Sequence, residues 1–201
     1  MSTLAEVRLW GRTIGAVSLE DGDAFASFQY DPAFAGSGIQ VSPLTMPLGH
    51  RVYRFPSLPR PTFHGLPGLL ADSLPDKFGN ALIDTWLATQ GRSPESFNAV
   101  ERLCYTATRG MGALEFAPVL GPRARTAQKI EIDALVALAS EVLGRRHGLQ
   151  GSFADPERKA ALNDILRVGT SAGGARAKAI IAWNPQTDEV RSGQVAAGPG
   201  F

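Results

Sequence analysis

The chain has 201 residues, a formal net charge of +1, 44% hydrophobic residues and 19% charged residues. This composition is typical of a soluble globular protein, and the near-neutral charge argues against a free-standing nucleic-acid binder. One cysteine and three widely separated histidines argue against a disulfide framework and against a zinc site. The amino terminus lacks a secretory pattern and no apolar run is long enough to span a bilayer, so we expect a cytoplasmic protein without membrane contact.

The first third of the chain predicts β-structure. Short apolar runs at residues 7–10, 14–17 and 25–30 are separated by glycine and aspartate, which is typical of hairpins. The acidic residues at positions 20–23 are interpreted as a solvated turn. Residues 42–68 contain six prolines, and since proline fixes φ and lacks an N–H donor, this stretch predicts a packed connection of loop and edge structure.

Two helices are predicted next. The run from Asp72 to Asp76 offers capping side chains and a proline suited to a first turn, so a helix is expected to begin near Ser73 and to end at Gly91. Helix capping accounts for both aspartates, so we prefer it to the alternative that they are a pair of catalytic carboxylates. A second helix is predicted after Pro94, with these apolar residues facing inward: Phe97, Val100, Leu103 and Cys104.

The remaining elements follow a glycine turn. Residues 109–118 predict a turn that feeds a strand, and Gly121 marks a boundary. Residues 131–143 predict an amphipathic helix, and a short helix is expected from Asp155 to Ile165. Residues 179–183 predict a buried strand, followed by a turn and a second strand at 190–195.

The glycine-rich loop at residues 169–178 is the most chemically suggestive stretch, because small residues let backbone N–H groups approach a phosphate. A Walker A loop fails because Ala175 stands where the lysine is required, and Lys178 comes three residues later. A dinucleotide fingerprint fails because Ser171 replaces its second glycine. A loop that runs into a β-hairpin suits the flap over ATP phosphates in protein-kinase-like folds, although an ordinary glycine-rich turn explains the loop taken alone equally well.

Three segments together resemble the HipA family of toxin kinases: residues 63–79, 110–118 and 169–178. The resemblance implies an α+β fold. It places a HipA-like N-terminal subdomain, rich in β-structure and carrying helices, at residues 1–120. It places the start of a protein-kinase-like N-lobe, with the phosphate loop, at residues 121–201.

The resemblance also implies a function. Members are serine/threonine kinase toxins of bacterial type II toxin–antitoxin systems, which use ATP and Mg²⁺. They phosphorylate an aminoacyl-tRNA synthetase, and this leads to growth arrest and persistence. They bind a HipB-like helix-turn-helix antitoxin and reach DNA only through it.

By position, Ser171 matches the serine that the family autophosphorylates. The residues that match the family's ATP phosphate loop are Ser171, Ala172, Gly173, Gly174, Ala175 and Lys178. A phosphoserine adds about −1.5 to −2 charges, and Arg176 or Lys178 could pair with it.

The catalytic aspartate and the metal ligands of the family come later than Phe201 in its sequence order, so no catalytic or metal-binding residue is assigned in this chain. We therefore expect the N-terminal portion of a longer kinase, inactive alone and without a bound cofactor. Two alternatives stay open: a non-catalytic module that restrains a separate kinase in trans, and a small nucleotide-binding domain that uses the 169–178 loop.

Overall fold

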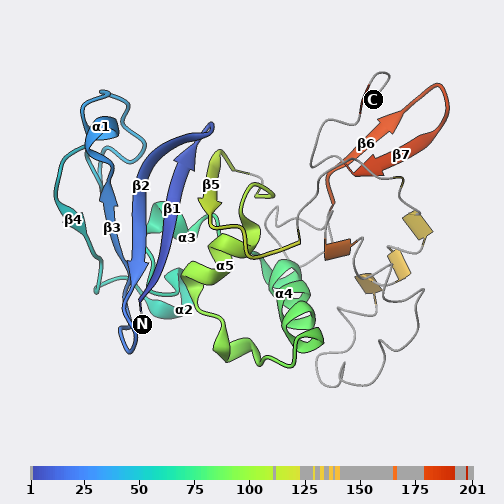
Figure 1. The fold of residues 1–201 in the computed structure, drawn as a ribbon, viewed down its shortest axis with the longest axis horizontal. Helices are drawn as coiled ribbons and strands as arrows, with labels where there is room; N and C mark the ends of the chain where they lie inside the picture. Colours follow the sequence, from blue (N-terminus) through green and yellow to red (C-terminus); the bar gives the residue numbers. More distant parts are fainter. Residues whose placement is uncertain are drawn as a thin grey trace. The chain divides into compact units, whose positions relative to one another are not determined.

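The computed structural model describes residues 2–110, 112–122, 129, 132–133, 136–137, 139–140, 165–166, 179–192 and 198. The chain divides into two compact units (Figure 1). The first unit comprises Met1–Leu74 and Phe97–Gly121, and the second comprises Pro75–Ser96 and Pro122–Phe201. The assignment of residues 1–120 and 121–201 to a HipA-like subdomain and a kinase N-lobe stays a prediction.

A five-stranded antiparallel sheet forms the centre of the first unit, in the order β4-β3-β2-β1-β5. Its strands are β1 (Thr3–Leu9), β2 (Arg12–Leu19), β3 (Ser27–Tyr30), β4 (Val52–Tyr53) and β5 (Leu114–Ala117). The predicted hairpins and the strand after the glycine turn are thus confirmed. Strand β5 comes from the far end of the unit and pairs with β1 at Glu6↔Ala117 and the three following positions (Figure 1).

The β1–β2 hairpin owes its shape to two backbone features. Trp10 and Gly11 form its tip with φ values of 51° and 74°, the left-handed conformation that a two-residue type I′ turn requires. The register then shifts, because Val7 pairs with Gly15 while Arg8 pairs with Thr13. Ile14 is the extra residue of this bulge, and consequently Ile14 and Gly15 are both buried although they are adjacent in a strand.

The core lies on one face of the sheet, which is covered by short helices. These are α2 (Arg60–Phe63), α3 (Gly68–Ala71) and α5 (Ala99–Thr106), and they lie behind the sheet in Figure 1. Helix α5 contacts β1, β2 and β5. The largest apolar side chains of this core are fully or almost fully buried: Val7, Ile14, Val17, Phe28, Leu66, Leu70, Leu103 and Phe116.

The proline-dense connection is packed, as predicted. Tyr30 stacks on Phe34 of α1 (Pro32–Ala35) with ring centroids 6.0 Å apart, and it meets Tyr53 edge-on at 5.9 Å. The Tyr30 hydroxyl donates to the carbonyl oxygen of Met46 at 2.7 Å, and Met46 is itself buried. The connection also contains α2, which the sequence analysis did not expect.

Helix α4 (Lys77–Thr89) begins later than predicted. Asp76 is its N-cap and accepts a hydrogen bond from the Gly79 backbone N–H at 2.8 Å. Pro75 therefore lies before the helix. Asp72 instead follows α3, where its own backbone N–H bonds to the Gly68 carbonyl, so side-chain capping explains Asp76 but not Asp72.

The second predicted helix is divided. Pro94–Ser96 form a single 3₁₀ turn, η1, and α5 begins only after Asn98. The Asn98 side chain accepts from the Glu101 backbone N–H at 3.0 Å, and the Glu101 carboxylate accepts from the Asn98 N–H at 2.7 Å. This capping box explains the start of α5. The four residues predicted to face inward are buried.

The second unit holds α4, η1 and a β-hairpin of β6 (Ile181–Asn184) and β7 (Glu189–Ser192). The predicted hairpin is confirmed, but its first strand is not buried as predicted: Ile181 is 46% and Trp183 55% exposed. Among the described residues, β7 is the one strand that pairs with β6, and the side chains of β6 alternate between exposed and part-buried positions up to Asn184. The Trp183 indole instead donates to the Asp188 carboxylate at 2.9 Å across the turn.

Two further predicted helices are described only in part. Residues 132–133, 136–137 and 139–140 are helical, as are residues 165–166, and the rest of both predictions lies outside the described residues. Among the residues that the structure describes, no helix combines the length and apolar character that a membrane crossing requires.

Candidate functional site

The predicted phosphate loop lies outside the described residues. This applies to every residue assigned to it by sequence: Ser171, Ala172, Gly173, Gly174, Ala175, Arg176 and Lys178. Their roles therefore stay predictions. The structure does describe the element that follows, because β6 and β7 form an antiparallel hairpin with Trp183 opposite Val190.

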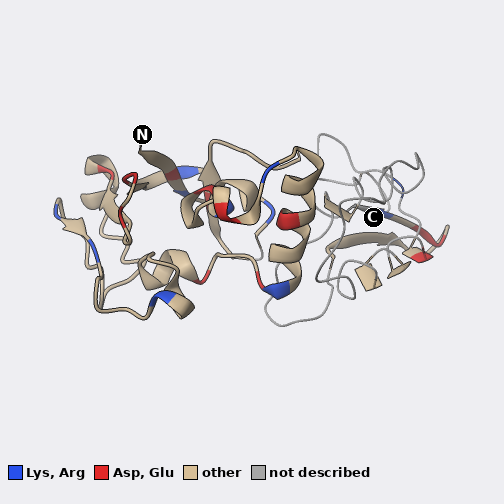
Figure 2. Cartoon of the chain, turned by 90° about the horizontal axis from the view of Figure 1, so that it is seen from below, with Lys and Arg blue, Asp and Glu red and all other residues tan. Residues whose placement is uncertain are grey.

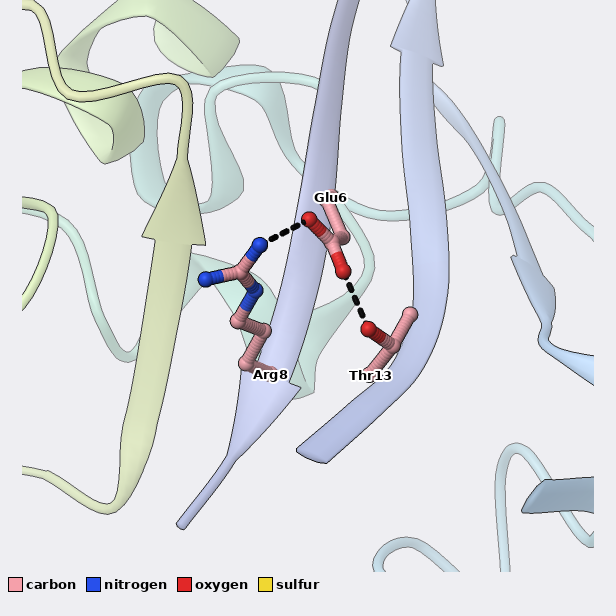
Figure 3. A network of polar contacts seen from close by, with 3 residues as sticks. All are labelled: Glu6, Arg8 and Thr13. Carbon is pink, nitrogen blue, oxygen red and sulfur yellow. Dashed lines mark hydrogen bonds and ion pairs between the residues drawn. The ribbon is translucent and has the colours of Figure 1, made fainter. Parts of the chain in front are cut away.

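A polar network occupies the open face of the main sheet (Figure 3). Arg8 donates to one carboxylate oxygen of Glu6 at 2.5 Å, and the Thr13 hydroxyl donates to the other. The hydrogen bond from Arg8 and then that from Thr13 lower the pKa of Glu6, while the same carboxylate raises the pKa of Arg8. Because both oxygens of Glu6 are occupied and its carboxylate is held ionised, this network ties β1 to β2 and is ill suited to accept a proton in catalysis.

The segment at residues 63–79 fastens the helices to the sheet. His64 ends α2 in the left-handed conformation with φ 52°, and Gly65 follows with φ 79°. The Gly65 carbonyl accepts from the Ala26 N–H at 2.8 Å, and a Cβ at this position would collide with the Ala24 carbonyl. Glycine is therefore required here for structure, and Leu66 beside it is buried.

A buried arginine organises the chain around the segment at residues 110–118. The Arg109 guanidinium lies 4.6 Å from the centroid of the Tyr105 ring, and it donates to the Tyr105 carbonyl oxygen. Arg109 is only 6% exposed, and its burial lowers its pKa. Burial of Tyr105 raises the pKa of the Tyr105 hydroxyl to about 12. The Leu120 backbone N–H donates to the Cys104 carbonyl at 3.1 Å, and this bond fastens the chain after β5 to the end of α5. The approach is close, since a Cβ on Gly121 would lie 2.6 Å from the Tyr105 carbonyl oxygen.

Neither a metal-binding cluster nor a reactive thiol is found among the residues that the structure describes. Within the described ranges, no cluster of three His, Cys, Asp or Glu side chains could hold a metal ion. Burial raises the pKa of the Cys104 thiol to about 11, so it stays protonated near neutral pH and is a poor nucleophile. The contacts described above hold the sheet and helices of the first unit together as a scaffold.

Sequence reasoning missed two features of this scaffold. The capping box at Asn98 was visible as Asn-x-x-Glu, a pattern that marks a helix start. The burial of Arg109 had no local signal, because arginine is mostly exposed and the chain at Gly121, which passes close to its guanidinium, lies beyond the intervening strand.

Comparison with protein families gives one identification. A family model described as the HipA N-terminal domain matches residues 5–117. Comparison with curated proteins gives no match to the chain. The matched range begins in β1 and ends at the last residue of β5, so it contains the five-stranded sheet except for the first two residues of β1. Because the match covers more than half of the chain and this sheet is intact, the chain belongs to the HipA family and carries its N-terminal domain.

Proposed function

We propose that this chain is the N-terminal part of a HipA-like serine/threonine kinase toxin of a type II toxin–antitoxin system. The observation that carries the proposal is the family domain at residues 5–117 in the same chain as the 169–178 loop and the β6–β7 hairpin. A glycine-rich loop leading into a hairpin is the arrangement with which kinases cover the phosphates of ATP. Nothing in the described residues conflicts with this order of elements.

In this proposal the loop residues bind and position, and do not themselves transfer a group. The backbone N–H groups of residues 171–175 and the Lys178 ammonium would contact the ATP phosphates, with Mg²⁺ held by residues outside this chain. ATP supplies the phosphoryl group that is passed to a hydroxyl. The catalytic base and the metal ligands are not assigned to any of the 201 residues, so the chain alone is expected to be inactive.

The proposed physiological reaction is phosphorylation of an aminoacyl-tRNA synthetase, which would stop translation and cause growth arrest. Autophosphorylation at Ser171 would place negative charge where the ATP phosphates bind and so switch the kinase off. A HipB-like helix-turn-helix antitoxin would bind the protein and link it to DNA, in the cytoplasm.

The test is an ATP-dependent kinase assay on the intact gene product, read by mass spectrometry of the peptide that spans residues 169–178. We expect a phosphopeptide that disappears in Ser171→Ala and persists in Thr170→Ala, the matched control at the neighbouring hydroxyl. Equal phosphorylation of this peptide in Ser171→Ala would refute the assignment. Transfer of phosphate by the 201-residue chain alone would refute the claim that it lacks the catalytic groups.

A second candidate is a non-catalytic module that restrains a separate kinase. The match to the N-terminal domain favours it too, since such a module would consist of this domain. Mixing the chain with a separately encoded kinase and measuring phosphate transfer distinguishes the two, because only a module inhibits in trans. ATP binding by the chain at micromolar concentration would instead favour a small nucleotide-binding domain.

A further inference from the structure

The charge of the chain is unevenly distributed around β4. Residues 32–71 contain no aspartate or glutamate, whereas they contain three arginines, at positions 51, 54 and 60. All three arginines are exposed. Figure 2 shows basic segments of the ribbon at its left, the β4 end of the first unit, with acidic segments beside them and further basic segments on other elements. This stretch carries a charge of +3 in a chain whose total is +1.

Strand β4 is also an edge of the sheet. It pairs with β3 at Phe28↔Tyr53 and Gln29↔Val52, and among the described residues no strand pairs with its other side. An edge strand offers backbone N–H and C=O groups to an added strand. Val52, at the centre of this edge, is 58% exposed.

The two residues of β4 lie between two exposed arginines, with Arg51 immediately before Val52 and Arg54 immediately after Tyr53. The Arg51 guanidinium lies 4.5 Å from the Tyr53 ring centroid, and this contact restrains the side chain while the residue stays exposed. An extended segment paired with β4 would therefore have an arginine near each end of the paired stretch.

The structure already contains a carboxylate at this surface. Asp23, from the turn between β2 and β3, binds Arg54 at 3.0 Å, and both side chains are about 40% exposed. The pair is a local example of the contact that an incoming acidic side chain would make. The neighbouring Glu20 and Asp21 are exposed, so this acidic turn would repel the dense phosphates of a nucleic acid more than the few carboxylates of a peptide.

From these observations we infer that the β4 edge, with Arg51 and Arg54, is a docking site for an extended acidic segment of a partner protein, which adds a strand to the sheet. Backbone hydrogen bonds supply pairing, and the arginines at either end of β4 select carboxylate side chains. The proline-dense surroundings hold the edge in shape, so little ordering cost accompanies binding.

The experiment uses the full 201-residue chain and a fluorescent seven-residue peptide of alternating Glu and Val, with binding followed by anisotropy at 50 mM NaCl. We expect saturable binding that weakens at least tenfold in the double variant Arg51→Gln/Arg54→Gln. Arg12→Gln removes an exposed arginine from the β1–β2 hairpin and is expected to change affinity less than twofold. Asp23→Asn frees Arg54 from its internal carboxylate and is expected to strengthen binding two- to threefold.

Strand addition has its own readout. One peptide carries N-methylated amides at its odd positions and the other at its even positions. N-methylation removes the N–H donors along one edge of an extended peptide, so each peptide can pair along its other edge only. We expect one of them to lose binding at least tenfold and the other to retain it. Retention by both, or an equal loss in the Arg12→Gln control, would overturn the docking mode. If a 20-base-pair DNA duplex binds more tightly than the peptide and displaces it, the partner is a nucleic acid and the inference is wrong.

Discussion

Replacing Gly15 by alanine tests how tightly the central strands are packed. Gly15 lies in β2, opposite Tyr30 of β3. A Cβ at this position would lie 2.7 Å from the Phe28 ring and even closer to the backbone carbonyl oxygen of Gln29. Such approaches are essentially never seen for real Cβ atoms, and the carbonyl belongs to a paired strand, so it cannot withdraw without disturbing the β2–β3 ladder.

The expected magnitude follows from two opposing terms. Overpacking a core costs about 1–3 kcal/mol in the free energy of unfolding. Removing a glycine from the unfolded chain returns about 0.4–1 kcal/mol. The net loss for Gly15→Ala is therefore about 1–2 kcal/mol, which for a unit of this size lowers Tm by roughly 5–15 °C.

The assay is native-state hydrogen exchange of the β1 and β2 amides, which reports the first unit by itself. Gly49→Ala is the matched control, because a Cβ at Gly49 meets nothing within 4 Å and its φ is not in the left-handed region. We expect exchange to accelerate in Gly15→Ala and to stay within error in Gly49→Ala. Adding Phe28→Leu to Gly15→Ala relieves only the ring contact, so the double variant should be less destabilised than the sum of the singles. Equal protection in Gly15→Ala and the wild type would refute the packing argument.

Four further outcomes are expected. Asn98→Ala removes the α5 cap and the 2.8 Å bond to Thr3, which should cost about 1–2 kcal/mol of unfolding free energy in urea titrations. Cys104, whose pKa burial raises to about 11 against 9.0 for the ordinary thiol, should resist iodoacetamide at pH 8 until the protein unfolds. Because the unfolded thiol ionises first, this group's contribution to stability should fall as pH rises from 9 towards 11, which thermal unfolding in that range measures. Gly121→Ala forces its Cβ against the Tyr105 carbonyl and should lower Tm, whereas Gly36→Ala, whose nearest atom is 3.8 Å away, should not.

Local sequence signals predicted most of the first unit. Hairpins were expected where glycine and aspartate separate apolar runs, and β1, β2 and β3 lie there. These signals work because strand alternation and turn chemistry act over a few residues. The pairing of β1 with β5 was not predicted, since nothing within residues 3–9 indicates a partner more than 100 residues away.

The boundaries of helices were less well predicted, for a physical reason. A proline next to an aspartate can stand before the N-cap or inside the first turn, and only the backbone conformation decides between them. In α4 the extended φ and ψ of Asp76 place the cap there and leave Pro75 outside. The predicted burial of β6 was wrong for another reason. Its apolar residues predicted burial, but burial depends on which elements cover a strand, and the sequence pattern does not give that information.

Local sequence rules are also insufficient to identify the function of the candidate phosphate loop. Its assignment depends on a resemblance across residues 169–178, and no local rule distinguishes a phosphate flap from a glycine-rich turn. The segment at residues 169–178 precedes β6, and the turn at residues 185–188 joins β6 to β7, so this hairpin does not hold the candidate loop between its strands. A phosphorylated Ser171 would decide the question chemically, since an ordinary turn has no reason to carry that modification.

The order of the units along the chain constrains how the protein folds. The chain passes between its two units three times, after Leu74, Ser96 and Gly121. The first unit cannot complete its sheet until β5 is present, by which point α4 has already been synthesised as part of the second unit. Four apolar side chains of α4 are buried in the complete chain: Phe78, Leu82, Ile83 and Leu87. Helix α4 therefore belongs to the second unit although its sequence is inserted between two segments of the first.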